Sequence, residues 1–243
     1  MMGRSHLLIS TGVTISVLGM ANQKISLPVI AIAAVSALLP DIDEPNSLIV
    51  SRAIPTGFIR VLQTVLVAFA LYVQFFGSML TPWNTALAVM VGLVSFMPTR
   101  TLRNVVMTLI GIGLITLGHD FMPWNFILGS VLIICSLVPH RGLTHTVYGV
   151  IGWTGLLYFA THTYGHELWM AGGLSYMLHL LADALTNRGI RPLPPFKYRF
   201  KLKLMSTGTW TGNIVEKVCI GLTLVLVWIT FLQEIDLEIF ISK

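Results

Sequence analysis

Most of the 243-residue chain consists of long apolar stretches, and these constrain its fold more than any other feature. Runs of helical composition cover roughly 7–21, 27–40, 58–80, 85–98, 104–118, 124–139, 143–164, 168–186 and 214–232. Hydrophobic residues make up 55% of the chain and charged residues only 10%. The mean hydropathy is +0.81, which is far too high for a water-soluble domain. The sequence therefore predicts an all-α, polytopic membrane protein, a single membrane-embedded domain over residues 1–243 with about nine membrane segments.

Several of these runs have only about 14–16 residues, fewer than the ~20 that cross the core of a bilayer as a helix. Because backbone polar groups cannot stay unsatisfied in lipid, we expect the short runs to extend into polar flanks, to stay partial or to re-enter. No basic segment followed by a small-residue cleavage site precedes the first run, so no removable signal peptide is expected. Cys135 and Cys219 lie inside apolar runs, where packing is the usual role of a thiol.

The basic residues are divided unequally between the two sides that nine alternating spans would create. One side receives 13 of the 15 Lys and Arg residues. Since cytoplasmic loops carry the excess of Lys and Arg, we predict a bacterial cytoplasmic (inner) membrane protein with its N-terminus inside and its C-terminus outside. The surplus positive charge follows this distribution, so no nucleic-acid partner is expected. The cytoplasmic residues are Arg4, Arg52, Arg60, Arg100, Arg103, Arg141, Arg188, Arg191, Lys197, Arg199, Lys201, Lys203 and Lys217, against Lys24 and Lys243 outside.

An internal repeat is visible when the chain is shifted by 41 positions. Trp83-Asn84 then falls on Trp124-Asn125, Pro98 on Pro139, Arg100 on Arg141, Leu102 on Leu143, Val106 on Val147 and Gly111 on Gly152. The pattern predicts that residues 83–120 are a degenerate duplicate of the helical hairpin 124–161. Thr99 and Asn104 stand in the earlier copy where the later copy has His140 and His145, so the earlier copy is expected to be structural.

Histidines and carboxylates gather near the ends of the apolar runs, although they played no part in deriving the topology. They are His6, Asp41, Asp43, His140, His145, His179, Asp183 and Glu216. All fall on the predicted cytoplasmic side, while His119, His162 and His166 fall on the other side and are interpreted as interfacial residues. Burying polar groups in so apolar a chain is costly unless a metal or an anionic group compensates them. We therefore predict one convergent site at the cytoplasmic ends of the helices.

The spacing of these residues is typical of metal binding. His179 and Asp183 are four residues apart and share one face of a helix. Asp41 and Asp43 follow a proline, and alternate side chains of the extended segment expected there point the same way. Imidazole with carboxylate suits Zn, with Mn or Fe as alternatives, and the cysteine positions exclude a thiolate site. These ligands exceed the needs of one ion, so we expect two or three, an arrangement that activates water and clamps a phosphoryl group.

Basic residues beside these positions predict an anion-binding side to the site. Thr144 is expected to cap a helix that starts after Gly142, whose free N–H groups would favour an anion near Arg141. The segment 188–203 alternates basic with aromatic or aliphatic residues, as is typical of an interfacial strap for lipid headgroups. The residues expected to bind substrate are Arg141, Arg188, Arg191, Lys197 and Arg199.

Each feature also has a purely structural interpretation. A single His or Asp near a span end is more often an interfacial polar residue than a ligand. Asp41 and Asp43 could close a turn, and His179 with Asp183 could be a hydrogen-bonded pair between packed helices. The basic loop could anchor the topology without touching any substrate. Their joint placement on one side of the membrane favours the metal site.

The motifs that carry these residues resemble the YdjM family, also called DUF457, of inner-membrane proteins to which metal-dependent hydrolysis is ascribed. They are SHLLIS at 5–10, LLPDIDEPNS at 38–47, HRGLTHT at 140–146, HLLADALT at 179–186 and TGNIVEK at 211–217. The resemblance covers both ends of the chain but not roughly 58–125, where shorter members pass directly from PDID to HRG. It implies that the eight His, Asp and Glu residues named above are the metal-site positions.

A more distant likeness is to zinc-dependent phospholipase C and P1 nuclease, which are helical phosphodiesterases with three zinc ions. The match lies in the His-x-x-x-Asp spacing of His179 and Asp183. The tryptophan amino terminus that ligates metal in those enzymes has no counterpart at Met1, so the metal count need not be the same.

These patterns together predict a membrane-bound, metal-dependent hydrolase of a phosphate ester in a lipid or lipid-linked substrate. Arg141 would stabilise developing charge, and Asp43 would accept the proton of the attacking water. The alternative is a non-catalytic membrane module with a structural metal site, or a lipid or metal carrier. Midplane charges would favour transport, and the ionisable residues instead gather at span ends.

Overall fold

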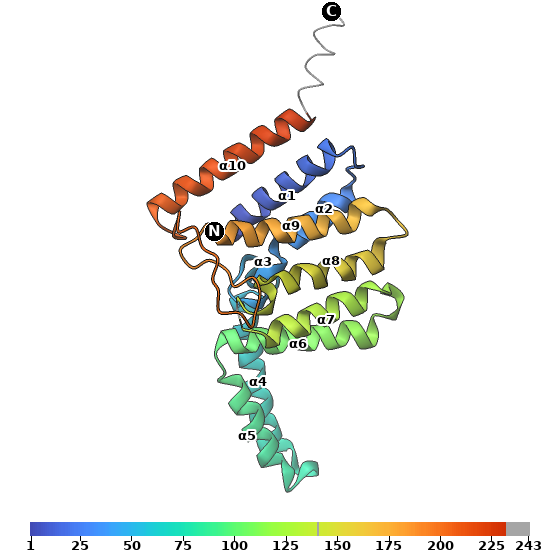
Figure 1. The fold of residues 1–243 in the computed structure, drawn as a ribbon. Coiled ribbons are helices and arrows are strands. Elements are labelled where there is room, and N and C mark those ends of the chain that lie inside the picture. Colours follow the sequence, from blue (N-terminus) through green and yellow to red (C-terminus); the bar gives the residue numbers. More distant parts are fainter. Residues whose placement is uncertain (140, 232–243) are drawn as a thin grey trace, which may run out of the picture.

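The fold is described from a computed structural model that covers residues 1–139 and 141–231 (Figure 1). Each of the nine apolar runs contains one long helix. The helices are α1 (Gly3–Met20), α2 (Leu27–Leu38), α3 (Leu48–Ala53), α4 (Thr56–Phe76), α5 (Trp83–Ser95), α6 (Thr99–Leu117), α7 (Trp124–Leu137), α8 (Val147–Thr161), α9 (His166–Ala184) and α10 (Trp210–Phe231). Four 3-10 turns join them: η1 (Leu39–Asp43), η2 (Ser78–Leu80), η3 (His119–Phe121) and η4 (Leu143–His145). The expectation of an all-helical chain is confirmed for the described residues.

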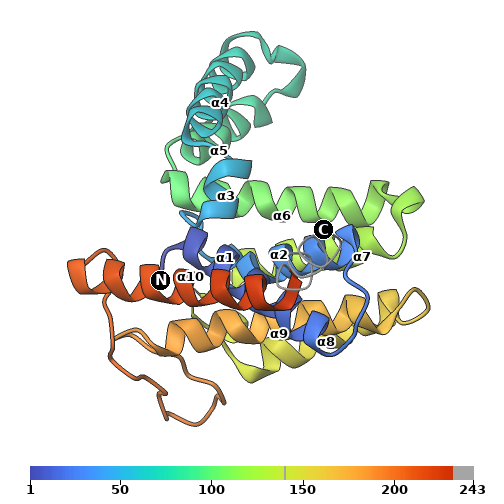
Figure 2. The same cartoon turned by 90° about the horizontal axis from the view of Figure 1, so that it is seen from above.

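Seven of the long helices lie side by side and run between two common ends of the molecule. Helix α1 packs on α2, α9 and α10, helix α8 packs on α9, and α6 packs on α7, so the layer continues from α10 to α6 (Figures 1 and 2). Its largest buried cluster joins residues of η1, α6, α8 and α9, including Leu39, Leu102, Leu157 and Leu180. The end that holds the starts of α1, α8 and α10 also holds the ends of α2, α7 and α9. The start of α6 lies at this end too, so all seven helices of the layer have one end there.

Small residues let these helices approach closely. Gly111 of α6 faces Gly129 of α7, and a Cβ atom built on either glycine would lie within 2.7 Å of the other's carbonyl oxygen. On α9, a Cβ atom on Gly173 would meet the side chain of Thr154 of α8 at 2.5 Å. Since lipid tails are as apolar as leucine, such close contact is a main source of helix association in membranes.

The helix α4–α5 hairpin leaves this layer. It crosses the direction of the other helices steeply in both views and projects from the end where α6 begins (Figures 1 and 2). Helix α4 packs on α5 and touches α6. Helices α4, α6 and α10 are long and apolar enough to cross a membrane, whereas α5, α7 and α8 are apolar but shorter. The structure thus supports three candidate spans with further apolar helices, and the total of nine segments stays a prediction.

Two neighbouring hairpins share their construction at the spacing of 41 residues found in the sequence. One consists of α4, η2 and α5, and the other of α6, η3 and α7. In both, a glycine follows the first helix, and a Pro-Trp-Asn sequence opens the second at Trp83 and Trp124. The duplication of 124–161 by 83–120 remains a prediction from the sequence.

Two local expectations were wrong. Asp41 and Asp43 do not lie in an extended segment, because α2 continues into the 3-10 turn η1. Helix α8 starts at Val147 rather than just after Gly142, and its cap is Thr146, whose hydroxyl accepts a hydrogen bond from the backbone N–H of Gly149. Thr144 instead donates its hydroxyl hydrogen bond to Asp43. A side chain with a buried carboxylate partner is not available to cap a helix.

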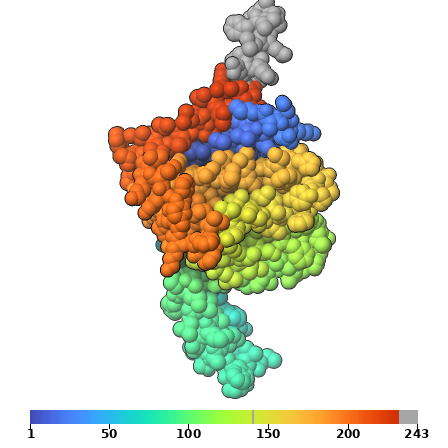
Figure 3. Space-filling model, in the orientation of Figure 1, coloured from blue at the N-terminus to red at the C-terminus, as the bar shows by residue number. Residues whose placement is uncertain are grey.

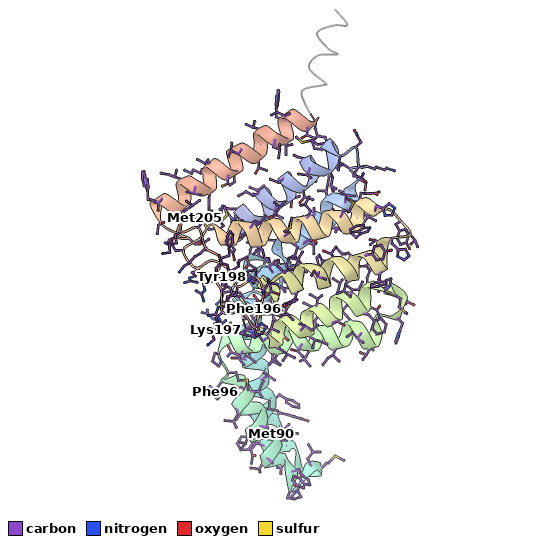
Figure 4. All side chains as sticks on the ribbon, viewed as in Figure 1. Met90, Phe96, Phe196, Lys197, Tyr198 and Met205 are labelled. Carbon is purple, nitrogen blue, oxygen red and sulfur yellow. The ribbon has the colours of Figure 1, made fainter. Side chains whose placement is uncertain are left out.

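The long connection between α9 and α10 folds back over the end of the bundle where the chain segments converge (Figure 3). Ile190 and Phe200 exchange two backbone hydrogen bonds of 2.9 Å, and the N–H of Val147 bonds the carbonyl of Pro192 at 2.9 Å. Met205 is buried against Ala182 of α9, while Phe196, Lys197 and Tyr198 are exposed at the far turn of the loop (Figure 4). The loop is therefore held in place by its backbone and by Met205.

Candidate metal centre

Five side chains from four elements converge at this end of the bundle. They are His6 of α1, Asp41 of η1, His145 of η4, and His179 and Asp183 of α9. The three histidines and Asp183 are each at most 2% exposed. Their convergence follows from the fold, because α1 starts where α2 and α9 end. The prediction that distant parts of the chain meet at one site agrees with this geometry.

Asp183 lies at the middle of the cluster. Its Oδ1 atom is 3.4 Å from His6 Nε2, and its Oδ2 atom is 3.4 Å from His145 Nε2. The same Oδ2 atom is 3.0 Å from Arg141 Nη2. Each carboxylate oxygen thus faces a different imidazole, which is the arrangement a carboxylate needs to bridge two cation positions.

Asp41 faces two imidazoles, that of His145, which it shares with Asp183, and that of His179. Its Oδ1 atom is 3.5 Å from His145 Nε2 and 3.7 Å from His179 Nε2. The rings of His6 and His179 stack with their centroids 3.8 Å apart. Three imidazoles and two carboxylates therefore surround one small volume.

A second layer of polar groups sets the orientation of the rings. His179 Nδ1 lies 2.7 Å from the carbonyl oxygen of Ala37, so it carries the proton and donates it there. His145 Nδ1 lies 3.1 Å from Thr144 Oγ1 and 3.8 Å from Asp43 Oδ2. In both rings this leaves Nε2 directed at the carboxylates of the cluster. Outer partners of this kind fix the ring orientation of metal-binding histidines.

The electrostatics of the cluster are those of a site that attracts cations. Burial by itself lowers the pKa of His145, but the carboxylates of Asp183 and Asp41 outweigh it and raise that pKa from 6.5 to about 9. Burial raises the pKa of Asp41, yet the neighbouring His145 and His179 hold it well below its usual value. The carboxylates therefore stay ionised, and without another cation they keep a proton on His145.

Two ligand groups in the described residues fit a metal ion. One consists of His6, Asp41 and His179, and the other of His145, His179 and Asp183; within each, the ligand atoms lie within 4.8 Å of one another. His6 Nδ1 and His179 Nε2 are buried without a hydrogen-bond partner, a costly state that metal coordination would relieve. Two imidazoles with one carboxylate is a donor set of catalytic zinc sites and is also compatible with Mn or Fe.

The other predicted ligands lie around the cluster or outside the described residues. Asp43 is behind His145, on its Nδ1 side, and accepts a hydrogen bond from Thr144. Glu216 of α10 accepts hydrogen bonds from Ser5 Oγ at 2.5 Å and from the backbone N–H of Met2 at 3.0 Å. Neither belongs to the two ligand groups. His140 lies outside the described residues.

A cavity of about 470 Å³ opens onto the cluster. It is lined by the predicted residues His6, Asp41, Arg141, Asp183 and Arg188. Sequence reasoning missed Met1, Glu44, Ser47, Thr186, Asn187, Ser206 and Thr207, which complete its wall. Glu44 directly follows the Pro-Asp-Ile-Asp motif, and Asn187 directly follows the motif at 179–186, so these motifs could have indicated both residues. Ser206 carries no such signal, because only the returning loop brings it here.

A second cavity of about 470 Å³ adjoins the first through Arg141, and we call it the arginine pocket. Arg141, Arg188, Arg191 and Arg199 line it. Arg141 is held at a backbone φ of 61°, a left-handed conformation rare for residues with a side chain, and its Nη1 donates a 2.8 Å hydrogen bond to the carbonyl of Gly189. Lys197, the fifth predicted substrate contact, is exposed and is not among the residues lining this pocket.

Comparison with known proteins gives one family match. A family model described as YdjM inner membrane protein matches residues 1–236, which includes the region 58–125 that the motifs did not cover. No curated protein matches the chain, and no solved structure matches it.

Proposed function

The chain belongs to the YdjM inner membrane protein family, and we propose that it is a metal-dependent hydrolase of a phosphate ester carried by a lipid or lipid-linked molecule. Membrane localisation follows from the family and from the apolar helices. The reaction, the substrate and the placement of the site on the cytoplasmic face are our proposal.

The observation that carries the proposal is the cavity that meets the ligand cluster. A structural metal site is closed by its protein ligands, whereas a catalytic one keeps a position open. Here His6, Asp41 and Asp183 contribute both to the ligand groups and to the wall of a cavity of about 470 Å³. A substrate group can therefore reach the ligands, which favours catalysis over the structural alternative.

In this proposal His6, Asp41, His145, His179 and Asp183 would hold divalent ions, most simply two zinc ions. Bound ions would supply Lewis acidity towards a phosphoryl oxygen and would acidify water. Asp183 faces both His6 and His145, so it would contribute to holding the ions beside both rings. Asp43 orients His145 from behind and does not line the cavity, so we assign it a positioning role.

Arg141 is the group that would stabilise negative charge on the phosphoryl oxygens. Its guanidinium lies 3.0 Å from Asp183 and lines both cavities. A carboxylate and a carbonyl already hold this guanidinium in place, so little free energy is needed to align it during the reaction. Asp41 and Glu44 are carboxylates on the cavity wall, and either can reach a proton released there.

The test uses the purified full-length protein in lipid nanodiscs with a panel of lipid phosphomonoesters and phosphodiesters. We expect hydrolysis that a chelator abolishes and zinc restores. Asp183→Ala should lower both bound zinc and kcat/KM, the latter by about 100-fold or more. The exposed His119, at the opposite end of the bundle, provides the control His119→Ala, which should behave as wild type. Full activity of the metal-free protein or of Asp183→Ala would refute the proposal.

A further inference from the structure

An apolar groove separates α7 from α8, although these helices are consecutive in the chain. Helix α7 packs on α6, and α8 packs on α9. The groove between them has a volume of about 150 Å³ and is lined by Val131, Ile134 and Cys135 on one side and by Tyr148, Gly152 and Leu156 on the other. Ile134 and Leu156 are 48% and 42% exposed, so the groove is open along the outer face of the helices.

The floor of this groove lies beside the metal centre. Leu143 and Thr144 of η4 line it. Thr144 is the residue before His145, and its hydroxyl bonds Asp43 and lies 3.1 Å from His145 Nδ1. Tyr176 locks this floor by donating a 2.6 Å hydrogen bond to the carbonyl of Thr144. The short segment η4 thus lies between the apolar groove and the ligand cluster, because Leu143 and Thr144 line the groove and His145 belongs to the cluster.

The same segment starts in the arginine pocket, through Arg141. Among the described residues, no carboxylate lies within ion-pair distance of Arg188, Arg191 or Arg199, the other three arginines there. Guanidinium groups gathered without counter-charges form a strong site for a phosphate. Residues 141–145 therefore connect the arginine pocket, the candidate metal centre and the apolar groove.

We propose that one lipid phosphate occupies both places, with its phosphate in the arginine pocket and its hydrocarbon chain in the α7–α8 groove. The substrate then enters sideways from the bilayer. The occupant is a lipid chain because the groove opens between two apolar helices of a membrane protein, and the segment from Arg141 to Thr144 joins it to the positively charged arginine pocket. Naming this substrate class rests on the proposed function, but binding at the two places does not require turnover.

The physical roles of the two places differ. A chain that moves from the bilayer into the groove exchanges one apolar surrounding for another, so it gains little free energy. The arginines supply the affinity for the lipid phosphate, and the groove determines where the hydrocarbon chain of the lipid lies. Removing the phosphate should therefore weaken occupancy of the groove even when the chain is unchanged.

Two glycines of α8 allow a matched test. A Cβ atom on Gly152 or on Gly155 would meet no atom within 4 Å, so a larger side chain fits at both positions. Gly152 lines the groove and Gly155 does not. Gly152→Phe should fill the groove, and Gly155→Phe is the control. Leu156→Trp narrows the groove from an exposed position and serves if Gly152→Phe does not fold.

The experiment places the full-length protein in phosphatidylcholine vesicles that contain phosphatidic acid with a photoactivatable acyl chain. Cross-links are mapped by mass spectrometry. We expect them on α7 and α8, about tenfold fewer in Gly152→Phe or Leu156→Trp, and an unchanged number in Gly155→Phe. Diacylglycerol with the same chain should label these helices about tenfold less, and inorganic phosphate should reduce labelling by phosphatidic acid.

Three results would overturn the inference. The first is equal labelling in Gly152→Phe and Leu156→Trp, and the second is equal labelling by diacylglycerol. The third is labelling not of α7 and α8 but of an apolar groove between α1 and α10, which Leu7, Gly12 and Leu224 line. Labelling of α7 and α8 without any hydrolysis would support this inference and refute the proposed function. Hydrolysis with no label on α7 or α8 would do the reverse.

Discussion

His145 shows how single residues combine the requirements of folding and of a metal centre. It is 1% exposed, with Asp41 and Asp183 on its Nε2 side and Asp43 and Thr144 on its Nδ1 side. Its pKa of about 9 means that the metal-free cluster carries a proton on this ring at neutral pH. The proton occupies the place where a cation would bind, so protons and metal ions compete.

This competition predicts how metal affinity depends on pH. Because the raised pKa of His145 keeps the ring protonated below about pH 9, an ion that binds His145 must displace that proton at neutral pH. Zinc affinity should rise about tenfold per pH unit from pH 7 to pH 9 and then level off. The zinc affinity at each pH can be measured by competition with a chromophoric chelator. His145→Asn should flatten the profile and His119→Ala should not; a wild-type affinity independent of pH would contradict the prediction.

At the scale of elements, buried Arg103 of α6 holds the segment that follows the aspartates of η1. Its Nε donates to the carbonyl of Ile54 at 3.0 Å, and its Nη1 donates to the carbonyl of Pro45 at 3.0 Å and to Asn46 Oδ1 at 2.8 Å. One guanidinium thus satisfies the backbone on both sides of α3. We interpret Arg103 as a structural residue that keeps η1, and hence Asp41, in place.

Replacement of this arginine should destabilise the protein strongly. Arg103→Met leaves two buried carbonyls without donors, for an expected loss of about 2–4 kcal/mol. The thermal midpoint in detergent should fall by roughly 5–10 °C. Arg100, on the same helix, has a 58% exposed side chain that pairs with Glu44, so Arg100→Met should change stability by less than about 1 kcal/mol. Equal midpoints for the two variants would show that the buried network contributes nothing.

At the scale of the whole molecule, the arrangement of the helices places the charges at one end. The arginine pocket, Arg4 and the loop between α9 and α10 lie at the end that holds the candidate metal centre, while Lys24 lies in the connection between α1 and α2 at the other end (Figure 1). Because positive charge favours the cytoplasmic side, we expect the metal centre to face the cytoplasm.

Cysteine accessibility checks this orientation. In a background with Cys135→Ser and Cys219→Ser, Lys24→Cys should react with a membrane-impermeant maleimide in intact spheroplasts. Lys197→Cys, on the exposed turn of the loop, should react only after permeabilisation. The reverse pattern would place the metal centre outside and contradict the assigned topology.

Features that depend on residues close together in the chain could be predicted from the sequence, whereas features that depend on contacts between distant residues could not. Helices appeared wherever the chain is apolar for a dozen residues or more, because lipid leaves the backbone no alternative to internal hydrogen bonds. His6, Asp41, His145, His179 and Asp183 could be named as candidate ligands because imidazoles and carboxylates are rare in such a chain, and the structure brings these five side chains together. The cap at Thr146 was missed because Thr144 is used by Asp43, a residue 101 positions away in the chain.

The apolar runs and the rare charged side chains, both readable from the sequence, were enough to establish a helical membrane protein and most of its candidate ligands. Tertiary structure alone decided that Asp183 faces both His6 and His145, that Asp43 lies behind the cluster, and that the α4–α5 hairpin leaves the bundle. The groove between α7 and α8 is likewise visible only in the tertiary structure. Hydropathy follows from each residue separately, whereas the contacts between distant segments depend on how complete helices pack.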